Sequence, residues 1–208
     1  MKKVCVGITA ADSIVGHGII KSLRKSDISS SLRIIAFEYF NDLVSSYWVD
    51  KTYIMPDILK IGVDRESYIQ KLITHIKNED IKILFVAIGF ELEMMAENRE
   101  RIKHETGCEV IVSSPEVIRI AGDKYQTYRF LKDNNIPCPQ TWLPEEIDMV
   151  TYPAVIKPRS GTGSKGVSTV YSKDELLEKL HELKKPIIQE NIGTQDDEYT
   201  CGILYIEE

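Results

Sequence analysis

The sequence is poor in cysteine and lacks a long apolar run. Its four cysteines include no C-x-x-C pair, which argues against a structural zinc site and predicts free thiols in a reducing compartment. The start of the chain joins Lys2 and Lys3 to a short apolar run that ends by Asp12, which is not the pattern of a signal peptide or of a membrane span. We therefore expect a cytoplasmic protein that does not enter a membrane.

A basic patch is also missing. The 26 lysines and arginines are outnumbered by 32 acidic residues, the formal net charge is -6, and the basic residues do not cluster. A nucleic-acid binder needs clustered positive charge to release counterions, so this composition argues against nucleic acid as a partner. With 43% hydrophobic and 28% charged residues, the chain has the composition of a globular protein with a buried core. Small molecules or proteins are the expected partners.

Two well-known nucleotide-binding motifs are absent. A Walker loop requires a lysine directly after its last glycine, but Val167 follows Gly166. A dinucleotide fingerprint requires closely spaced glycines that lead into a helix, whereas Gly7 and Gly16 lie too far apart and the residues after Gly166 have the composition of a strand. An NAD-binding Rossmann protein, whose cofactor would depend on Gly16 and Gly18, therefore remains only a weaker alternative.

Residues 1–118 show alternating strand and helix patterns. Apolar runs rich in β-branched residues predict strands at residues 3–8, 32–37, 51–54, 81–88 and 108–112. The segments between several of these runs repeat apolar residues with the helical period, and Asp64 is a suitable N-cap for one of them. Such alternation is typical of a parallel sheet with crossover helices. The acidic residues Glu91, Glu93 and Glu97 are expected on a solvated helix face.

The pattern changes near residue 118, where we place a domain boundary. Ser114 precedes a proline and is typical of a helix start, and Asp123 is a suitable N-cap for a second helix. A third helix is predicted after Ser172, whose side chain can form a capping box with Glu175. Further strands are expected around residues 155–157, 166–170 and 186–190.

The most informative stretch runs from Tyr152 to Val170. A short strand ends at Lys157, and the loop Ser160–Gly166 then carries three glycines and three hydroxyl residues before a second strand begins. Because glycines leave backbone N–H groups uncovered, such a loop beside a lysine on a strand suits a polyphosphate. Taken alone, the same composition is also typical of an ordinary hairpin connection.

Three stretches together resemble the ATP-grasp enzymes, in particular their carbamoyl-phosphate-synthase-like and biotin-carboxylase-like members. They are AGDKYQTYRFLKDNNIPCPQTW, YPAVIKPRSGTGSKGV and IIQENIGTQDDEY, in that order. The resemblance implies an α/β fold with three parts. These are a Rossmann-like preceding domain with a parallel sheet at 1–118, an α+β lid subdomain of the ATP-grasp fold at 119–189, and the incomplete start of a C-terminal lobe at 190–208. We expect the chain to be the N-terminal portion of a ligase and to be inactive alone.

The same resemblance assigns residues to a nucleotide. Lys124 and Lys157 would contact the phosphates, and the glycine-rich loop would cover them. Glu190 to Ile192 would be the hinge that meets adenine, with Val155 and Ile192 on the two faces of the purine. Glu198 resembles the acid that binds the ribose hydroxyls, with Asp196 or Asp197 as alternatives. The implied nucleotide-binding residues are Lys124, Val155, Lys157, Ser160, Gly161, Thr162, Gly163, Ser164, Gly166, Glu190, Asn191, Ile192 and Glu198.

The activity implied by the resemblance is ATP-dependent activation of a small-molecule carboxylate, or of carbonate, as an acyl phosphate that an amine-type nucleophile attacks. ATP and Mg²⁺ are the implied cofactors. The metal ligands are expected beyond residue 208, so no metal-binding or catalytic residue is assigned within the chain. Because the preceding domain often contributes to the substrate site in this family, Asp12 and Glu38 are candidates there, and a homodimer is a candidate assembly. A non-catalytic nucleotide-binding or scaffold module is the main alternative.

Overall fold

The computed structural model describes residues 3–41, 43–161, 163–194, 196, 199 and 201–202. The chain divides into two compact units, residues 1–118 and residues 119–208. They are called the first and the second unit below, and each is described by itself.

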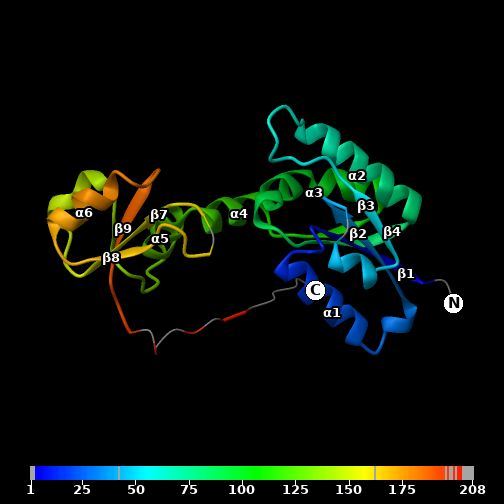
Figure 1. The fold of residues 1–208 in the computed structure, drawn as a ribbon, viewed down its shortest axis with the longest axis horizontal. Coiled ribbons are helices and arrows are strands. Elements are labelled where there is room, and N and C mark those ends of the chain that lie inside the picture. The colour runs from blue at the N-terminus through cyan, green and yellow to red at the C-terminus, as the bar shows by residue number, and fades with distance from the viewer. Residues whose placement is uncertain are drawn as a thin grey trace. The chain divides into compact units, whose positions relative to one another are not determined.

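The first unit is built on a five-stranded sheet in the order β3-β2-β1-β4-β5, with parallel neighbours throughout (Figure 1). The strands are β1 Val4–Thr9, β2 Leu32–Glu38, β3 Lys51–Ile54, β4 Ile81–Val86 and β5 Glu109–Ile111. This is the strand order of a doubly wound α/β fold. The α/β fold with a parallel sheet that the sequence predicts is therefore confirmed.

Successive side chains along each strand point to opposite faces of the sheet, and both faces are apolar. Helices therefore cover both faces. Figure 1 shows α1 on one face of the sheet and α2 and α3 on the other. Ile34 packs with Ile20 of α1, and Ile35 lies in the cluster that includes Leu72 of α2 and Met95 of α3. Asp64 caps α2 as expected, since its side chain accepts a hydrogen bond from the Glu66 N–H. The helices are α1 Ile14–Lys25, α2 Arg65–Glu79 and α3 Leu92–Thr106, and short 3-10 helices lie at η1 Ser29–Ser31, η2 Val44–Tyr47 and η3 Gly89–Glu91.

Glu91 corrects one expectation, because it does not lie on a solvated helix face. It ends η3, immediately before α3, and its side chain is fully buried. The hydroxyl groups of Tyr39 and Tyr68 donate hydrogen bonds to its Oε1 atom. These partners come from other elements of the fold, so the local sequence around Glu91 does not reveal them.

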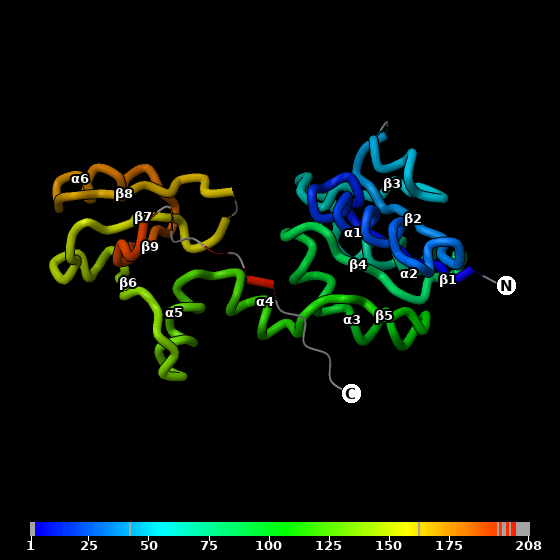
Figure 2. The backbone as a smooth tube through the Cα atoms, turned by 90° about the horizontal axis from the view of Figure 1, so that it is seen from below, coloured from blue at the N-terminus to red at the C-terminus, as the bar shows by residue number. Residues whose placement is uncertain are grey.

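The second unit carries a four-stranded antiparallel sheet in the order β6-β9-β7-β8. Ala154, Ile156 and Ile188 face the core on one side of it, where they pack with Leu176 of α6. Figures 1 and 2 show α6 on that side of the sheet and α5 on the other. The strands are β6 Thr141–Trp142, β7 Ala154–Pro158, β8 Ser168–Val170 and β9 Pro186–Glu190. The helices are α5 Lys124–Asp133, η4 Pro144–Met149 and α6 Lys173–Leu180, and α4 Pro115–Gly122 contains the boundary between the two units.

The caps of the second unit follow the sequence closely. The Asp123 side chain accepts from the backbone N–H groups at the start of α5, and the Ser172 side chain accepts from the Glu175 N–H at the start of α6. The capping box is shifted by one residue, because the Glu175 carboxylate accepts from the Tyr171 N–H. Within the described residues, no helix is both long and apolar enough to cross a membrane.

Candidate functional site

The polar face of the second sheet brings the predicted site residues together. Val155 and Lys157 alternate with Ala154 and Ile156 along β7, so they lie on the face opposite the core. Gln189 pairs with Val155 in the neighbouring strand β9 and therefore shares that face. This arrangement places an amine, an amide and an apolar side chain on one surface.

Lys157 is held by a chain of hydrogen bonds. Its Nζ atom donates to Gln189 Oε1 at 2.6 Å, and Gln189 Nε2 donates to Thr141 Oγ1 at 2.8 Å. The hydroxyl of Thr141, which is buried, donates to the Pro139 carbonyl at 3.2 Å. Burial, and after it the positive charge of Lys124, lower the pKa of Lys157 below its usual value. An anion beside Lys157 would stabilise its charged form and so offset both effects on the pKa.

Lys124 faces the same cavity from the start of α5. A cavity of about 170 Å³ is lined by both lysines, together with Tyr128, Cys138 and Gln189 among others. The Lys124 Nζ atom also lies 3.4 Å from the Gly161 carbonyl oxygen, to which it donates. The two expected phosphate-binding lysines therefore lie at one cavity, next to the glycine-rich loop.

Asp123 and Arg159 join the start of α5 to the end of β7. Arg159 Nη2 lies 2.6 Å from Asp123 Oδ2, and Arg159 Nε lies 3.0 Å from the same oxygen. The Arg159 carbonyl accepts from the Lys124 N–H at 2.9 Å. Burial alone would raise the pKa of Asp123, but hydrogen bonds from Arg159 and from two backbone amides lower it below its usual value. This pair, called the Asp123–Arg159 clasp below, fixes Lys124 relative to the loop.

The glycine-rich loop uses backbone conformations that favour glycine. Gly161, Gly163 and Gly166 have φ angles of 131°, 67° and 72°. A Cβ atom on Gly166 would also lie 2.8 Å from Leu183 Cδ2 and 3.2 Å from Pro158 Cγ, so a side chain here would require its neighbours to shift as well as a strained backbone. Ser164 adopts a φ of 54° beside them, and Ser160 is exposed at the start of the loop. Thr162, which the sequence also assigns here, lies outside the described residues.

The expected hinge follows directly from β9. Glu190 ends that strand, and its backbone N–H donates to the Gln140 carbonyl at 2.8 Å. Its Oε2 atom accepts from the Gln140 N–H at 3.1 Å, so the side chain braces the backbone. Asn191 and Ile192 are exposed. Glu198 lies outside the described residues, as does the alternative Asp197.

In the first unit, the candidates Asp12 and Glu38 are hydrogen-bonded to each other. Glu38 Oε1 accepts from the Asp12 N–H at 2.6 Å and from the Ser45 hydroxyl at 3.0 Å. Burial raises the pKa of Glu38, whose side chain is almost wholly enclosed. In an NAD-binding protein the acid after the second strand binds the ribose, but here it is enclosed and used within the fold. This geometry argues against the NAD alternative.

Several residues of the site were missed by the sequence reasoning. Gln189, Tyr128 and Cys138 line the cavity, and Arg159 braces it. Gln189 carried a usable signal, because a polar side chain after two isoleucines in a strand indicates a second, polar face. Cys138 and Tyr128 had no sequence signal that predicted their place at the cavity, since only the fold brings α5 and the segment after it to this sheet.

Family models match both units. An ATP-grasp domain matches residues 121–198, and the N-terminal domain of PylC-like proteins matches residues 17–111. Among curated proteins, a carbamoyl-phosphate synthase of Methanobrevibacter smithii is 25% identical over 175 residues, which cover 82% of this chain and 44% of that protein. The resemblance to the ATP-grasp enzymes is thereby confirmed.

Solved structures share the fold. An L-amino acid ligase of Bacillus licheniformis has a TM-score of 0.66 at 15% identity over 92% of this chain and 45% of its own. A biotin carboxylase domain of Hydrogenobacter thermophilus, in complex with MgADP, ADP and bicarbonate, has a TM-score of 0.61 at 17% identity over 91% of this chain and 44% of its own. The chain thus spans under half the length of these relatives.

Proposed function

We propose that the second unit, whose residues 121–198 match an ATP-grasp domain, binds ATP for a ligase that joins a carboxylate to an amine-type nucleophile. The observation that carries the proposal is the cavity shared by Lys124 and Lys157 beside the glycine-rich loop. Two cations at one small cavity are costly unless an anion joins them, and a nucleotide phosphate supplies that charge.

Each part of the nucleotide has residues suited to it. Lys124 and Lys157 offer point charges to the phosphates, and the loop offers backbone N–H groups. The backbone of Glu190 and Ile192 offers an acceptor and a donor to the adenine edge. Val155 and the exposed Ile192 offer apolar contact to its faces. Glu198, in the role of ribose acid, belongs to the same proposal.

The proposed reaction has two steps. A carboxylate or carbonate oxygen attacks the γ-phosphorus of ATP, and ADP leaves, which forms an acyl phosphate. The amine lone pair then attacks the activated carbonyl, phosphate leaves, and the amine proton is lost. Charge moves onto the phosphates in the first step, so the lysines would stabilise it there.

Magnesium enters this proposal as the cation that accompanies ATP. Among the described residues, no group of three or more His, Cys, Asp or Glu side chains could hold a metal ion. We therefore assign no residue of this chain to the metal and derive no step from it.

Replacing Lys157 tests the proposal directly. Lys157→Ala removes a charged hydrogen-bond donor. We expect this change to lower the affinity for Mg-ATP at least about tenfold. Isothermal titration calorimetry on wild type and variant measures the loss. Lys184→Ala is the matched control, because Lys184 is exposed in the same unit and lies outside the cavity. Equal affinity in wild type and Lys157→Ala would refute the assignment.

A further inference from the structure

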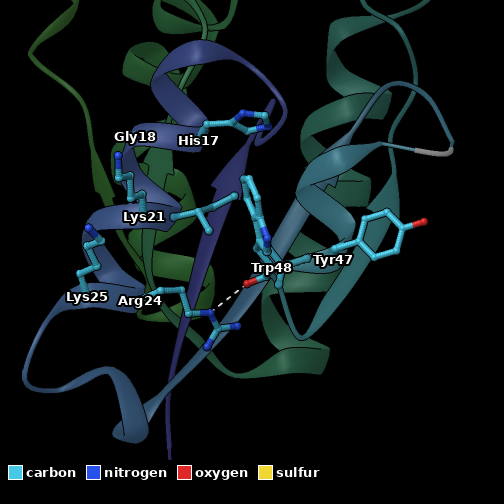
Figure 3. A pocket seen from close by; sticks show the side chains of 9 residues that line it. His17, Gly18, Lys21, Arg24, Lys25, Tyr47 and Trp48 are labelled. Atoms are coloured by element: carbon cyan, nitrogen blue, oxygen red, sulfur yellow. Dashed lines mark hydrogen bonds between the residues drawn. The ribbon is translucent and has the colours of Figure 1, made fainter.

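The first unit holds a larger cavity that the ATP proposal does not use. It has a volume of about 870 Å³, lies between α1 and the segment that includes η2, and falls within the range of small-molecule sites (Figure 3). Helix α1 contributes His17, Lys21, Arg24 and Lys25 to it, and the other wall includes Trp48. The cavity therefore combines an aromatic ring with several basic groups.

Trp48 is held in place although it is open to solvent. Its exposed fraction is 49%, and its ring meets the His17 ring edge-on with centroids 5.6 Å apart. Arg24 Nε donates to the Trp48 carbonyl at 2.9 Å, and its Nη2 atom binds Asp50 at 2.9 Å. Figure 3 shows Trp48 between His17 and Arg24, whereas Tyr47 points away from α1. A fixed, exposed indole can stack a planar group without a large loss of side-chain entropy.

Lys21 and Lys25 supply positive charge that the fold does not neutralise. They lie one turn apart on α1, where two like charges destabilise a helix. In the part of the chain that the structure describes, neither lysine forms an ion pair, and no acidic side chain lines the cavity. In a chain with a net charge of -6, this cavity is locally basic. An anion placed there would relieve the repulsion.

Gly18 leaves the cavity open. A Cβ atom at this position would meet nothing within 4 Å, and Gly18 lines the cavity from the interior of α1. Glycine inside a helix is less favourable than alanine, because glycine loses more conformational freedom on folding. Helix α1 is therefore less stable with Gly18 than with alanine, at a position where a side chain would extend into the cavity.

We propose that this cavity binds a small anion that carries a planar aromatic group. The ring would stack on Trp48, and the anionic group would bind Lys21 and Lys25. Arg24 holds the backbone of Trp48 and is not needed as a direct contact. The site belongs to the first unit and does not depend on nucleotide binding in the second.

Indole NMR signals can locate the binding event. The chain has two tryptophans, and Trp142 is buried in the second unit, so it serves as an internal reference for Trp48. We expect 1-naphthyl phosphate to shift the Trp48 indole N–H signal in a saturable way and to leave that of Trp142 unchanged. Inorganic phosphate and 1-naphthol each lack one half of the ligand and should bind at least about tenfold more weakly. A Trp48 signal that stays fixed at millimolar 1-naphthyl phosphate, or that responds equally to 1-naphthol, would overturn the proposal.

Two kinds of variant test separately the positive charge of the cavity and its open volume. Lys21→Gln/Lys25→Gln should weaken binding of 1-naphthyl phosphate at least about tenfold. Lys82→Gln/Lys103→Gln removes the same charge from the same unit outside the cavity and should leave binding unchanged. Gly18→Leu should abolish binding while α1 becomes more stable, so the loss cannot come from unfolding. Unchanged binding in both cavity variants would contradict the site.

The two sites are tested independently. Lys157→Ala should leave the response of Trp48 to 1-naphthyl phosphate intact, and Lys21→Gln/Lys25→Gln should leave Mg-ATP binding intact. Loss of the Trp48 response in Lys157→Ala would place the probe at the second unit and overturn the proposal made here. Failure of Mg-ATP to bind the wild type would overturn the proposed function alone.

Discussion

At the scale of single residues, both units contain polar side chains whose hydrogen-bond partners lie far away in the sequence. Lys157 owes its position to Gln189, and Glu91 owes its burial to two tyrosines. The position of Lys157 near the end of a strand and before a glycine-rich loop was predictable, because the apolar run and the glycines are local signals. The burial of Glu91 was not, since its partners are Tyr39 and Tyr68, which follow β2 and lie in α2. Pairwise contacts across a fold leave no trace in the local pattern.

Gln189→Glu should weaken Mg-ATP binding without unfolding the protein. The new carboxylate would pair with Lys157 at the position where Gln189 Oε1 now lies, and it would repel the phosphates. We expect at least about tenfold lower affinity by calorimetry. Gln126→Glu, on the exposed side of α5, carries the same added charge outside the cavity and should bind normally. Affinity that is equal in both variants would show that Gln189 does not face the phosphates.

Glu91 should make the stability of the protein depend on pH. Burial raises the pKa of Glu91 above its usual value of 4.5, although hydrogen bonds from Thr9, Tyr39 and Tyr68 act to lower it. As the pH rises above 4.5, the unfolded state ionises at this residue before the folded state does. The free energy of unfolding should therefore fall until the pH passes the raised pKa.

Glu91→Gln mimics the protonated side chain and should lack this fall in stability. Urea unfolding of wild type and variant across this pH range measures the difference. Glu93→Gln, at an exposed position two residues later, should follow the wild type. Parallel profiles for wild type and Glu91→Gln would contradict the account.

At the scale of elements, the second unit is organised by where its helices and strands end. Helix α5 begins at Lys124, and β7 ends at Pro158, just before the loop. The N-cap at Asp123 and the strands β7, β8 and β9 were predictable from local sequence, because caps and apolar runs are short-range signals, whereas the two-residue strand β6 was not predicted. The Asp123–Arg159 clasp was not predictable, since it joins two elements through side chains far apart in the chain.

Arg159→Ala should loosen this junction. The clasp is partly buried and bidentate, but solvent reaches it, so we expect the free energy of unfolding to fall by about 1 kcal/mol. Affinity for Mg-ATP should fall as well, because Lys124 would no longer be held beside the loop. Arg129→Ala, on the exposed face of α5, is the control for charge and helix propensity. If the two variants match in urea unfolding and in calorimetry, the clasp has no role.

At the scale of the whole molecule, the chain joins a parallel α/β unit to an antiparallel unit with an ATP-grasp match. The parallel sheet of the first unit was predictable because apolar strand runs alternate with helical patterns along the chain, whereas its strand order β3-β2-β1-β4-β5 was not predicted from the sequence. The cavity beside Trp48 was not predicted either, because a pocket depends on which side chains are left exposed around it. Because the chain spans under half the length of the relatives it matches, ligase turnover is a proposal only.

Protection of Cys138 by nucleotide tests the central claim most directly, because Cys138 lines the same cavity as Lys124 and Lys157. Its thiol is partly exposed, whereas Cys5 and Cys108 are buried. We predict that Mg-ATP slows the alkylation of Cys138, as measured by peptide mass spectrometry. The double variant Lys124→Ala/Lys157→Ala should abolish this protection. An alkylation rate of Cys138 that saturating Mg-ATP leaves unchanged would contradict the placement of ATP in this cavity.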